Sequence, residues 1–376
     1  MNGTFAAQDL AVVRGGDGSL SAVARPTPRP AANDVVFRVL AAAVCGTDRQ
    51  IVRGERPDAA AILGHEGVGE VAAIGAAVAD FAVGERFVFN PVAPGDQDEI
   101  LGHSTAGLFQ QHLALDARDV RRRALAEPLP PEVPLPHAAL AEPLGTVVYT
   151  HELMANVGAP RSLLIVGAGP IAILHALYAQ RCLGITTVRV VCRDEARARW
   201  LTERHLLAAN DLVRDPAAAP AGFAAAVLCT PARATAAALA AALPKLADGA
   251  AIALVAGIAA PLLPCWPDLD LARLRRANTC GHPAPPATIA TTDDGRRVHL
   301  FGHRGTAGRH LRRALEVLRA PFWSALYSHR IPLPALPDAL MAIAAGRPIA
   351  GAHYVKGFVD VTARTGEAMP WHEVAS

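Results

Sequence analysis

Short apolar runs, separated by glycine and proline, fill the first 120 residues of the chain. Three of these runs cover Val35–Ala43, Gly67–Ile74 and Arg86–Phe89. Runs of this length, bounded by turn-forming residues, are typical of strands. The pattern therefore predicts a β-rich module at the start of the chain.

Near Leu140 the pattern changes, and helical segments begin to alternate with short apolar strands. A helix-compatible stretch over Leu144–Asn156 precedes the apolar strand Ser162–Val166. A helix from about Pro170 to Leu183 and a strand over Thr187–Cys192 come next. Strand, tight turn, helix and strand make up the βαβ unit of a doubly wound sheet. The alternation continues through the strands Ala224–Cys229 and Ala251–Val255.

The C-terminal part breaks this alternation. From about Phe301 it gives way to a helix over His310–Leu318 and a tail with strand-like runs. We therefore expect a β-rich domain over residues 1–150, a dinucleotide-binding domain over 151–302, and a return to the β-rich domain over 303–376. The segment Asn278–Arg297 contains three prolines, and we expect it to be an inserted loop.

Composition and charge narrow the classes of partner. The chain has 376 residues, 52% hydrophobic and 19% charged, which is ordinary for a compact protein of two domains. The formal net charge of +2 provides no strong field to attract nucleic acid or a membrane surface. The uncharged window Gly249–Pro267 contains three prolines and is too broken to span a bilayer. We expect a small-molecule substrate, with no nucleic-acid or membrane partner.

The cysteines and the N-terminal residues bear on the compartment. The six cysteines show no paired spacing, so we expect no disulfide framework and a reducing environment. Asp9 and Arg14 stand where a secretory signal would need an apolar segment. Both features predict a cytoplasmic protein.

A glycine-rich turn follows the strand Ser162–Val166 and opens the next helix. Gly167 permits the tight turn, Gly169 lets the backbone approach a pyrophosphate, and Ala172 allows close packing of helix on sheet. The free N–H groups and positive dipole end of that helix would face the pyrophosphate. The turn therefore predicts dinucleotide binding, with a structural turn in some other α/β protein as the alternative.

The end of the second strand bears on which dinucleotide is bound. NAD enzymes place a carboxylate there to accept hydrogen bonds from the ribose hydroxyls. Here Cys192 occupies that position, and Arg193 could pair with a 2′-phosphate, which favours NADP. In the alternative, Arg193 is a solvated surface residue and Asp194 accepts the ribose of NAD. The expected cofactor-binding residues are Gly167, Gly169, Pro170, Ile171, Ala172, Cys192, Arg193 and Thr230.

Potential metal ligands lie in three clusters upstream of this turn. Cys45 ends a strand-like run, His65 and Glu66 follow twenty residues later, and Glu142 stands further on. A thiolate, an imidazole and carboxylates suit zinc, which needs three protein ligands and one open position for catalysis. Taken singly, Cys45 could be a buried thiol, His65 a hydrogen-bonded core histidine and Glu142 a carboxylate at a helix start. Together, ahead of a dinucleotide motif, they predict a catalytic zinc site.

These motifs resemble those of the zinc-containing medium-chain dehydrogenases, in particular the sorbitol, polyol and threonine dehydrogenase branch. Gly64-His65-Glu66 with Gly69, Gly75 and Val78 matches the family's zinc signature at its fixed positions. The runs Cys45-Gly46-Thr47-Asp48, Ala141-Glu142-Pro143-Leu144 and Ser328–Leu333 match as well. The resemblance implies a GroES-like catalytic domain combined with a Rossmann domain, a fold class of α/β plus β. It also implies a homodimer or homotetramer.

The resemblance further implies roles for individual residues. Cys45 and His65 would bind zinc, and Glu66 and Glu142 would be exchangeable carboxylates, one direct and one acting through water. Thr47 would hydrogen-bond the substrate oxygen and pass its proton on, while Asp48 would orient His65. The metal would lower the pKa of a bound alcohol, and the hydride would pass to the nicotinamide.

Two features depart from the family pattern. The segment Asn90–Gln110 contains no cysteine, so we expect one catalytic zinc and no structural zinc. Gln50 stands where many members have a proton-relaying histidine, and a glutamine cannot ionise. His103 and His151 are the candidates for a substitute relay.

Other classes of oxidoreductase would require residues that this chain lacks, or would lack residues that it has. A short-chain dehydrogenase would need a tyrosine with a lysine four residues later, and no tyrosine of the chain has one. A zinc-free reductase of the same fold would lack Cys45 and His65. The remaining alternatives are a reductase of simple alcohols and aldehydes, and a non-catalytic dinucleotide-binding homologue. The predicted substrate is a secondary alcohol or ketone of a polyol, sugar or cyclitol-like molecule.

Overall fold

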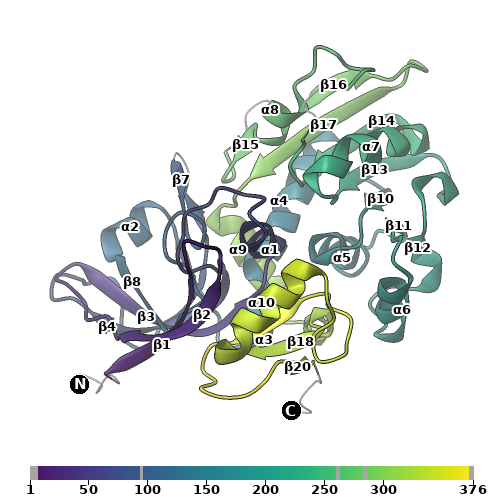
Figure 1. Ribbon diagram of the computed structural model, residues 1–376. Coiled ribbons are helices and arrows are strands. Elements are labelled where there is room, and N and C mark those ends of the chain that lie inside the picture. The colour runs from purple at the N-terminus through teal and green to yellow at the C-terminus, as the bar shows by residue number, and fades with distance from the viewer. Residues whose placement is uncertain (1–6, 94–95, 260–262, 283–286, 372–376) are drawn as a thin grey trace. The chain divides into compact units, whose positions relative to one another are not determined.

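The computed structural model describes residues 7–93, 96–259, 263–282 and 287–371. The chain divides into two compact units (Figure 1). Unit 1 comprises Met1–Glu142 and Ala307–Ser376, and unit 2 comprises Pro143–Thr306. Helix α4 (Ala141–Val157) runs across the first division without interruption. No loop or linker in the sequence therefore marks this boundary. The divisions fall at 142 and 306, whereas the sequence placed them at 150 and 302.

The main sheet of unit 1 is built around β3 (Asp34–Ala43), whose residues are buried along almost its whole length. Strand β3 pairs antiparallel with β4 (Glu66–Ile74), β8 (His112–Asp116) and β19 (Gly357–Asp360). Strand β19 comes from the far end of the chain, so residues after 306 complete a sheet that the N-terminal residues begin. The same sheet contains β5 (Arg86–Phe89), β9 (Ala126–Pro128), β18 (His329–Pro332) and β20 (Met369–Pro370).

Smaller elements surround this sheet. Strands β1 (Gln8–Arg14) and β2 (Leu20–Pro26) form one antiparallel pair, and β6 (Val92–Ala93) and β7 (Asp96–Ile100) form another. An apolar cluster that includes Phe37 and Phe89 fills the core. The helices of unit 1 are α1 (Gly46–Val52), α2 (Ala117–Arg122), α3 (Leu135–Ala138), α9 (Gly308–Val317) and α10 (Leu336–Ala345).

Unit 2 is a doubly wound parallel sheet. The strands are ordered β12-β11-β10-β13-β14-β17, the 3-2-1-4-5-6 order of a Rossmann domain. The fold class predicted from the sequence, a β-rich domain with a Rossmann domain, is therefore confirmed. The strands are β10 (Ser162–Val166), β11 (Thr187–Val191), β12 (Leu212–Val213), β13 (Phe223–Leu228), β14 (Leu246–Leu254) and β17 (Arg297–Arg304). The α-helices are α4, which lies in unit 2 from Pro143 onward, α5 (Pro170–Leu177), α6 (Glu195–Glu203), α7 (Ala232–Ala242) and α8 (Leu271–Arg275).

The expectation of an inserted loop over Asn278–Arg297 was wrong. The segment contains β15 (Asn278–Thr279), parallel to β17, and β16 (Thr288–Thr291), antiparallel to β17. The turn between β16 and β17 places Gly295 at a φ of +83°, a conformation that favours glycine. The prolines that suggested a loop lie at 283, 285 and 286, outside the described residues. The segment thus extends the sheet.

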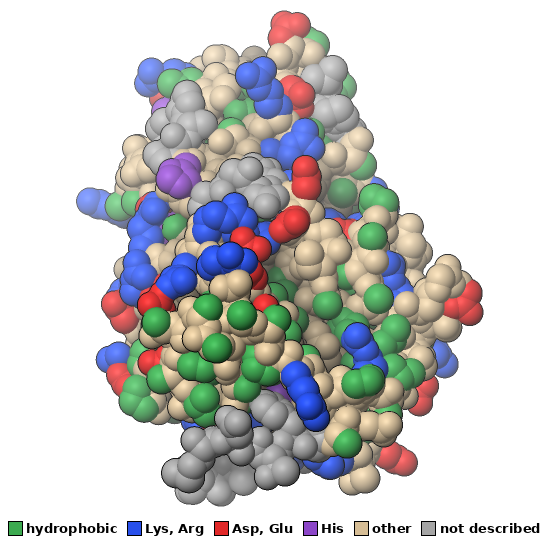
Figure 2. All heavy atoms as spheres, turned by 90° about the vertical axis from the view of Figure 1, so that its left-hand side faces the viewer, with side chains coloured by type: hydrophobic (Ala, Val, Ile, Leu, Met, Phe, Trp, Pro, Cys, Tyr) green, Lys and Arg blue, Asp and Glu red, His purple; other side chains and the backbone are tan. Residues whose placement is uncertain are grey.

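Two surface properties complete the description. Lys/Arg and Asp/Glu side chains lie next to one another over much of the face in Figure 2, in keeping with the small net charge. Among the described residues, no helix is both long and apolar enough to cross a membrane.

Candidate metal and cofactor sites

Three expected ligands meet in unit 1. The ligand atoms of Cys45, His65 and Glu66 all lie within 4.8 Å of one another. Cys45 follows β3 and precedes α1, while Glu66 begins β4. The antiparallel pairing of β3 with β4 sets Ala43 opposite Glu66, which brings the two strand ends together. The sheet register therefore assembles residues that are twenty positions apart.

The carboxylate of Asp48 ties the two ligand segments to each other. Asp48 is fully buried and accepts hydrogen bonds from the backbone N–H of Cys45 (2.8 Å) and of Gly64 (3.3 Å). Its Oδ1 lies 3.8 Å from His65 Nδ1. Burial raises the pKa of Asp48. A carboxylate on the far side of a ligating imidazole fixes the ring's orientation, the role expected for Asp48.

The electrostatics of the cluster favour a cation. Burial alone would lower the pKa of His65, but the Cys45 thiolate and the carboxylates of Asp48 and Glu142 outweigh it and raise that pKa to about 10. Burial also raises the pKa of Glu142 to about 7, although this residue is not fully shielded from solvent. Several acidic groups thus share a small volume with one imidazole. The donor set, a thiolate, an imidazole and carboxylates, fits a zinc ion.

The two candidate carboxylates differ in their surroundings. Glu66 forms a buried ion pair with Lys356, whose ammonium group also donates to Val44 O at 3.0 Å. Glu142 interacts electrostatically with His65, Glu66 and Lys356, but it is not among the three residues whose ligand atoms converge. Lys356 was not expected from the sequence. Its only sequence signal is that it is one of two lysines in the chain.

Helix α1 carries the other expected catalytic residues. Thr47 Oγ1 lies 3.6 Å from Cys45 Sγ, so the hydroxyl borders the ligand cluster. Gln50 is partly buried one turn further along the same helix.

The two candidate relay histidines occupy different units. His103 packs against His65 with ring centroids 4.7 Å apart. His151 lies in unit 2, where its Nε2 is 3.3 Å from His175 Nδ1, and burial lowers its pKa to about 4. A histidine whose pKa is this low is a weak base, so these surroundings do not favour His151 as a relay.

The glycine-rich turn of unit 2 has the geometry of a phosphate-binding loop. Gly167 has a φ of +119°, and a Cβ there would lie 2.5 Å from Cys229 O. A Cβ at Gly169 would meet nothing within 4 Å, so the backbone there is open to a ligand. Pro170 begins α5, and Ala172 is fully buried beneath it. These residues fit a dinucleotide pyrophosphate at the N-terminus of α5.

The segment after β11 contains the residues that the sequence places near the adenosine ribose of a bound dinucleotide. Cys192 is buried and donates its backbone N–H to Val213 O at 2.8 Å, while Arg193 is exposed. Asp194 caps α6, accepting from the N–H groups of Ala196 (3.0 Å) and Arg197 (3.2 Å). Its carboxylate is therefore engaged with its own helix.

Arg197 is a further basic residue at this edge that the sequence did not single out. Its Nη1 donates to Ala168 O, in the glycine-rich turn, at 3.2 Å. Thr230, after β13, is buried, and its hydroxyl lies 3.1 Å from that of Thr235.

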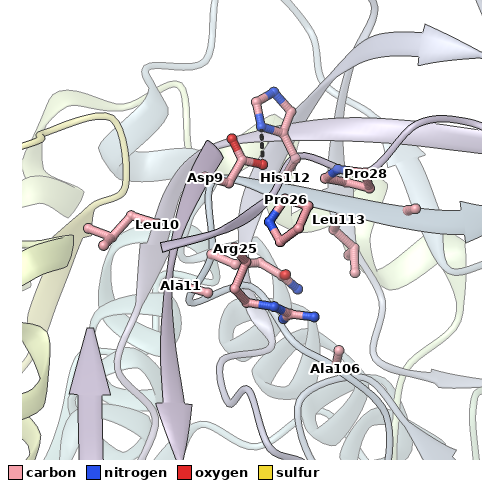
Figure 3. Close-up of a pocket in the computed structure, with 11 residues that line it drawn as sticks. Asp9, Leu10, Ala11, Arg25, Pro26, Pro28, Ala106, His112 and Leu113 are labelled. Atoms are coloured by element: carbon pink, nitrogen blue, oxygen red, sulfur yellow. Dashed lines mark hydrogen bonds and ion pairs between the residues drawn. The ribbon is translucent and has the colours of Figure 1, made fainter. Parts of the chain in front are cut away.

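A separate cavity of about 210 Å³ lies beside β1, β2 and β8 of unit 1 (Figure 3). Asp9 Oδ2 and His112 Nδ1 are 2.8 Å apart in its wall, and Arg25 also lines it. The lining includes no member of the ligand cluster. This cavity is therefore distinct from the candidate metal site.

Part of the chain is similar to known dehydrogenases in sequence. The model of the alcohol dehydrogenase GroES-like domain matches residues 31–124. L-threonine 3-dehydrogenase of Mesorhizobium japonicum is 31% identical over 219 residues, which cover 50% of this chain and 59% of that protein. Glucose 1-dehydrogenase of Thermoproteus tenax is 31% identical over 200 residues, covering 47% of this chain and 56% of that protein. The match thus spans less than two thirds of these relatives.

Solved structures share the fold over most of the chain. A zinc-binding dehydrogenase from Sinorhizobium meliloti 1021, bound to NADP, superposes with a TM-score of 0.71 at 23% identity, covering 94% of this chain and 100% of that one. The 2R,3R-butanediol dehydrogenase of Bacillus subtilis gives 0.67 at 18% identity, covering 94% and 99%. These matches support the resemblance to the medium-chain dehydrogenases of the alcohol dehydrogenase superfamily that the motifs predict.

Proposed function

We propose that this protein is a zinc-dependent oxidoreductase that transfers a hydride between NAD(P) and a secondary alcohol or ketone of a polyol, sugar or cyclitol-like molecule. The observation that carries the proposal is the convergence of Cys45, His65 and Glu66 around one point, in a chain that also has an open glycine-rich turn. The names of the relatives support a hydroxyl-bearing substrate, since they refer to threonine, glucose and butanediol.

Different side chains of unit 1 would bind the metal, orient its ligand and transfer the proton. Cys45 and His65 would hold the metal, with Glu66 or Glu142 as the carboxylate ligand, and bound zinc would supply Lewis acidity toward the substrate oxygen. Asp48 would help to orient His65, since it accepts from the backbone of Cys45 and Gly64 and its carboxylate lies 3.8 Å from the imidazole. The hydroxyl of Thr47, beside Cys45, would hydrogen-bond the substrate oxygen and pass its proton on.

The cofactor would bind at the glycine-rich turn and receive or give the hydride at its nicotinamide. We favour NADP because the carboxylate of Asp194 is engaged in capping α6, while Arg193 and Arg197 supply positive charge at the same strand end. Arg197, whose guanidinium donates to Ala168 O, would be a second candidate partner for a 2′-phosphate beside Arg193. The Sinorhizobium meliloti neighbour was solved with NADP, which supports the same choice.

A substrate panel tests the proposal. Purified protein is loaded with zinc and incubated with polyols, cyclitols, sugars, threonine and simple alcohols, each with NAD and with NADP, and the reduced nicotinamide is followed by absorbance. We expect turnover with at least one secondary alcohol and none in the Cys45→Ser variant. Turnover confined to simple primary alcohols would overturn the substrate class. Zinc and cofactor binding without any turnover would favour a non-catalytic homologue.

The same preparation tests the assembly. We propose a homodimer or homotetramer, in line with the family, and sedimentation of the zinc-loaded protein would distinguish these from a monomer.

A further inference from the structure

The loop that carries His65 is held along its backbone by a segment that lies about forty residues later. Leu108 N–H donates to Gly64 O at 2.9 Å, and Gly107 N–H donates to Ile62 O at 2.8 Å. Phe109 N–H donates to Leu63 O at 3.0 Å. The residues just before the metal ligand are therefore bonded, one after another, to the end of the segment Ile100–Phe109.

Glycines allow the His65 loop and the segment Ile100–Phe109 to pack backbone against backbone. A Cβ at Gly102 would lie 2.3 Å from Gly64 O, and one at Gly107 would lie 2.2 Å from the same oxygen. A Cβ at Gly64 would in turn lie 2.6 Å from the ring of Phe109. No side chain larger than hydrogen fits at these three points without a shift of the backbone.

The same segment turns one aromatic side chain toward the ligand. His103 is buried, and its ring stands at 89° to that of His65 with the centroids 4.7 Å apart, an edge-to-face pair. Its backbone is fixed because its carbonyl accepts from Ala60 N–H at 2.7 Å. Its position in the fold is thus set by contacts that do not involve the metal ligands.

The ring of His103 also lies near a carboxylate. Its Nδ1 lies 3.5 Å from Asp58 Oδ1. Arg56 grips that carboxylate through two hydrogen bonds, at 2.6 Å and 3.1 Å. His65 Nδ1 thus lies 3.8 Å from the Asp48 carboxylate without a hydrogen bond to it, and the ring of His103 packs against the imidazole.

We propose that His103 is a positioning residue that holds the imidazole of His65 in the orientation required for metal binding. The inference rests on the zinc site proposed above and adds to it a group from outside the ligand segments. Groups that orient a ligating histidine typically contribute a factor of about 10–100 in metal affinity. His103 acts through ring contact, so a residue that preserves an aromatic face should preserve most of the effect.

The test compares zinc affinity in four proteins: the wild type, His103→Leu, His103→Phe and His137→Leu. His137 is the matched control, because it is also a buried histidine of unit 1 but bonds through Nδ1 to Leu318 O at 2.8 Å. Zinc dissociation constants are measured by competition with a chromogenic chelator. Cobalt-substituted samples report the ligand geometry through their visible absorption, and thermal unfolding of the metal-free proteins reports stability.

We expect His103→Leu to weaken zinc binding about 10–100-fold and to shift the cobalt bands. His103→Phe should stay closer to the wild type than His103→Leu, and His137→Leu should bind zinc as the wild type does. The inference is overturned if His103→Leu keeps the wild-type affinity and cobalt spectrum, if His103→Phe is as weak as His103→Leu, or if His137→Leu loses as much affinity. These outcomes leave the zinc site standing, whereas a wild-type protein that binds no zinc removes the site and this inference together.

Discussion

The metal-ligand cluster of unit 1 and the glycine-rich turn of unit 2 reach functional geometry by different routes. The cluster gathers side chains from distant segments, since Cys45, His65, His103 and Lys356 come together only through the sheet and its loops. The turn is made almost entirely by consecutive residues that follow one strand. The cluster is buried and dense in charge, whereas the turn presents backbone to open space.

This difference predicts how strongly each site responds to substitution. A buried charged cluster depends on every partner, because removing one leaves another uncompensated. A ligand bound by backbone N–H groups is less sensitive to substitution of nearby side chains. Substitutions around the glycine-rich turn should mainly change which dinucleotide is preferred. Substitutions in unit 1 should therefore have larger effects than those around the cofactor turn.

The largest effect on turnover short of losing the metal is expected at Thr47. Thr47→Val removes the hydroxyl beside Cys45 but keeps the shape of the side chain, and turnover should fall by about 10²–10⁴-fold. Thr47→Ser keeps the hydroxyl and should remain close to the wild type. Steady-state rates with zinc content determined in parallel make the comparison. An equal loss in both variants would show that Thr47 acts by packing.

The buried ion pair between Lys356 and Glu66 should dominate the stability of the metal-free cluster. Lys356→Met leaves the Glu66 carboxylate buried without its counterion and should lower the free energy of unfolding by about 3–5 kcal/mol. Adding Glu66→Gln removes that charge as well and should recover most of the loss. Urea unfolding of the metal-free proteins measures both. If the Lys356→Met loss is negligible, or the double variant recovers nothing, the pair does not act as a coupled unit.

Cofactor selection at the turn should show a smaller effect. A guanidinium paired with a 2′-phosphate contributes about 1.5–3 kcal/mol, so the wild type should prefer NADPH over NADH by about 10–100-fold. Arg193→Leu and Arg197→Leu should each reduce the preference, and Cys192→Asp with Arg193→Leu should turn it toward NADH. Equilibrium titrations with NADPH and NADH measure it. Tighter binding of NADH by the wild type would contradict the assignment.

A further effect, spread over about two and a half pH units, concerns the pH dependence of unit 2. Burial lowers the pKa of His151 to about 4, from an ordinary value of 6.5. Between these two values the unfolded chain binds a proton that the folded chain does not. Stability therefore falls as the pH drops from 6.5 to 4, with a slope of at most about 1.4 kcal/mol per pH unit for this residue. Urea unfolding across that range should show a shallower slope in His151→Leu, and an unchanged slope would contradict the assignment.

The contrast between the sites also explains what could be predicted from the sequence. The turn and the Rossmann strands were predictable because periodicity and glycine spacing are local signals. Cys45, His65 and Glu66 could be singled out as candidates because each lies in a short motif at a strand end, and the structure brings their ligand atoms together. Lys356 was missed because it lies 290 residues from Glu66 and no spacing connects them. Arg197 was missed because its contact with Ala168 depends on how far a helical side chain reaches in space.

The misread segment Asn278–Arg297 has a different cause. Its prolines lie between strands β15 and β16, so they do not interrupt either strand. The pair Asp294-Gly295, which precedes β17, is typical of a hairpin turn. The prolines earlier in the segment nevertheless led to the prediction of a loop.

Metal content tests the central claim most directly. We propose one zinc site in the chain, built on Cys45 and His65, and no structural zinc. Elemental analysis of zinc-loaded, desalted protein should give about one zinc per wild-type chain and close to none for Cys45→Ser, with NADPH binding retained by both. Two zinc ions per wild-type chain, or equal zinc content in the two proteins, would contradict it.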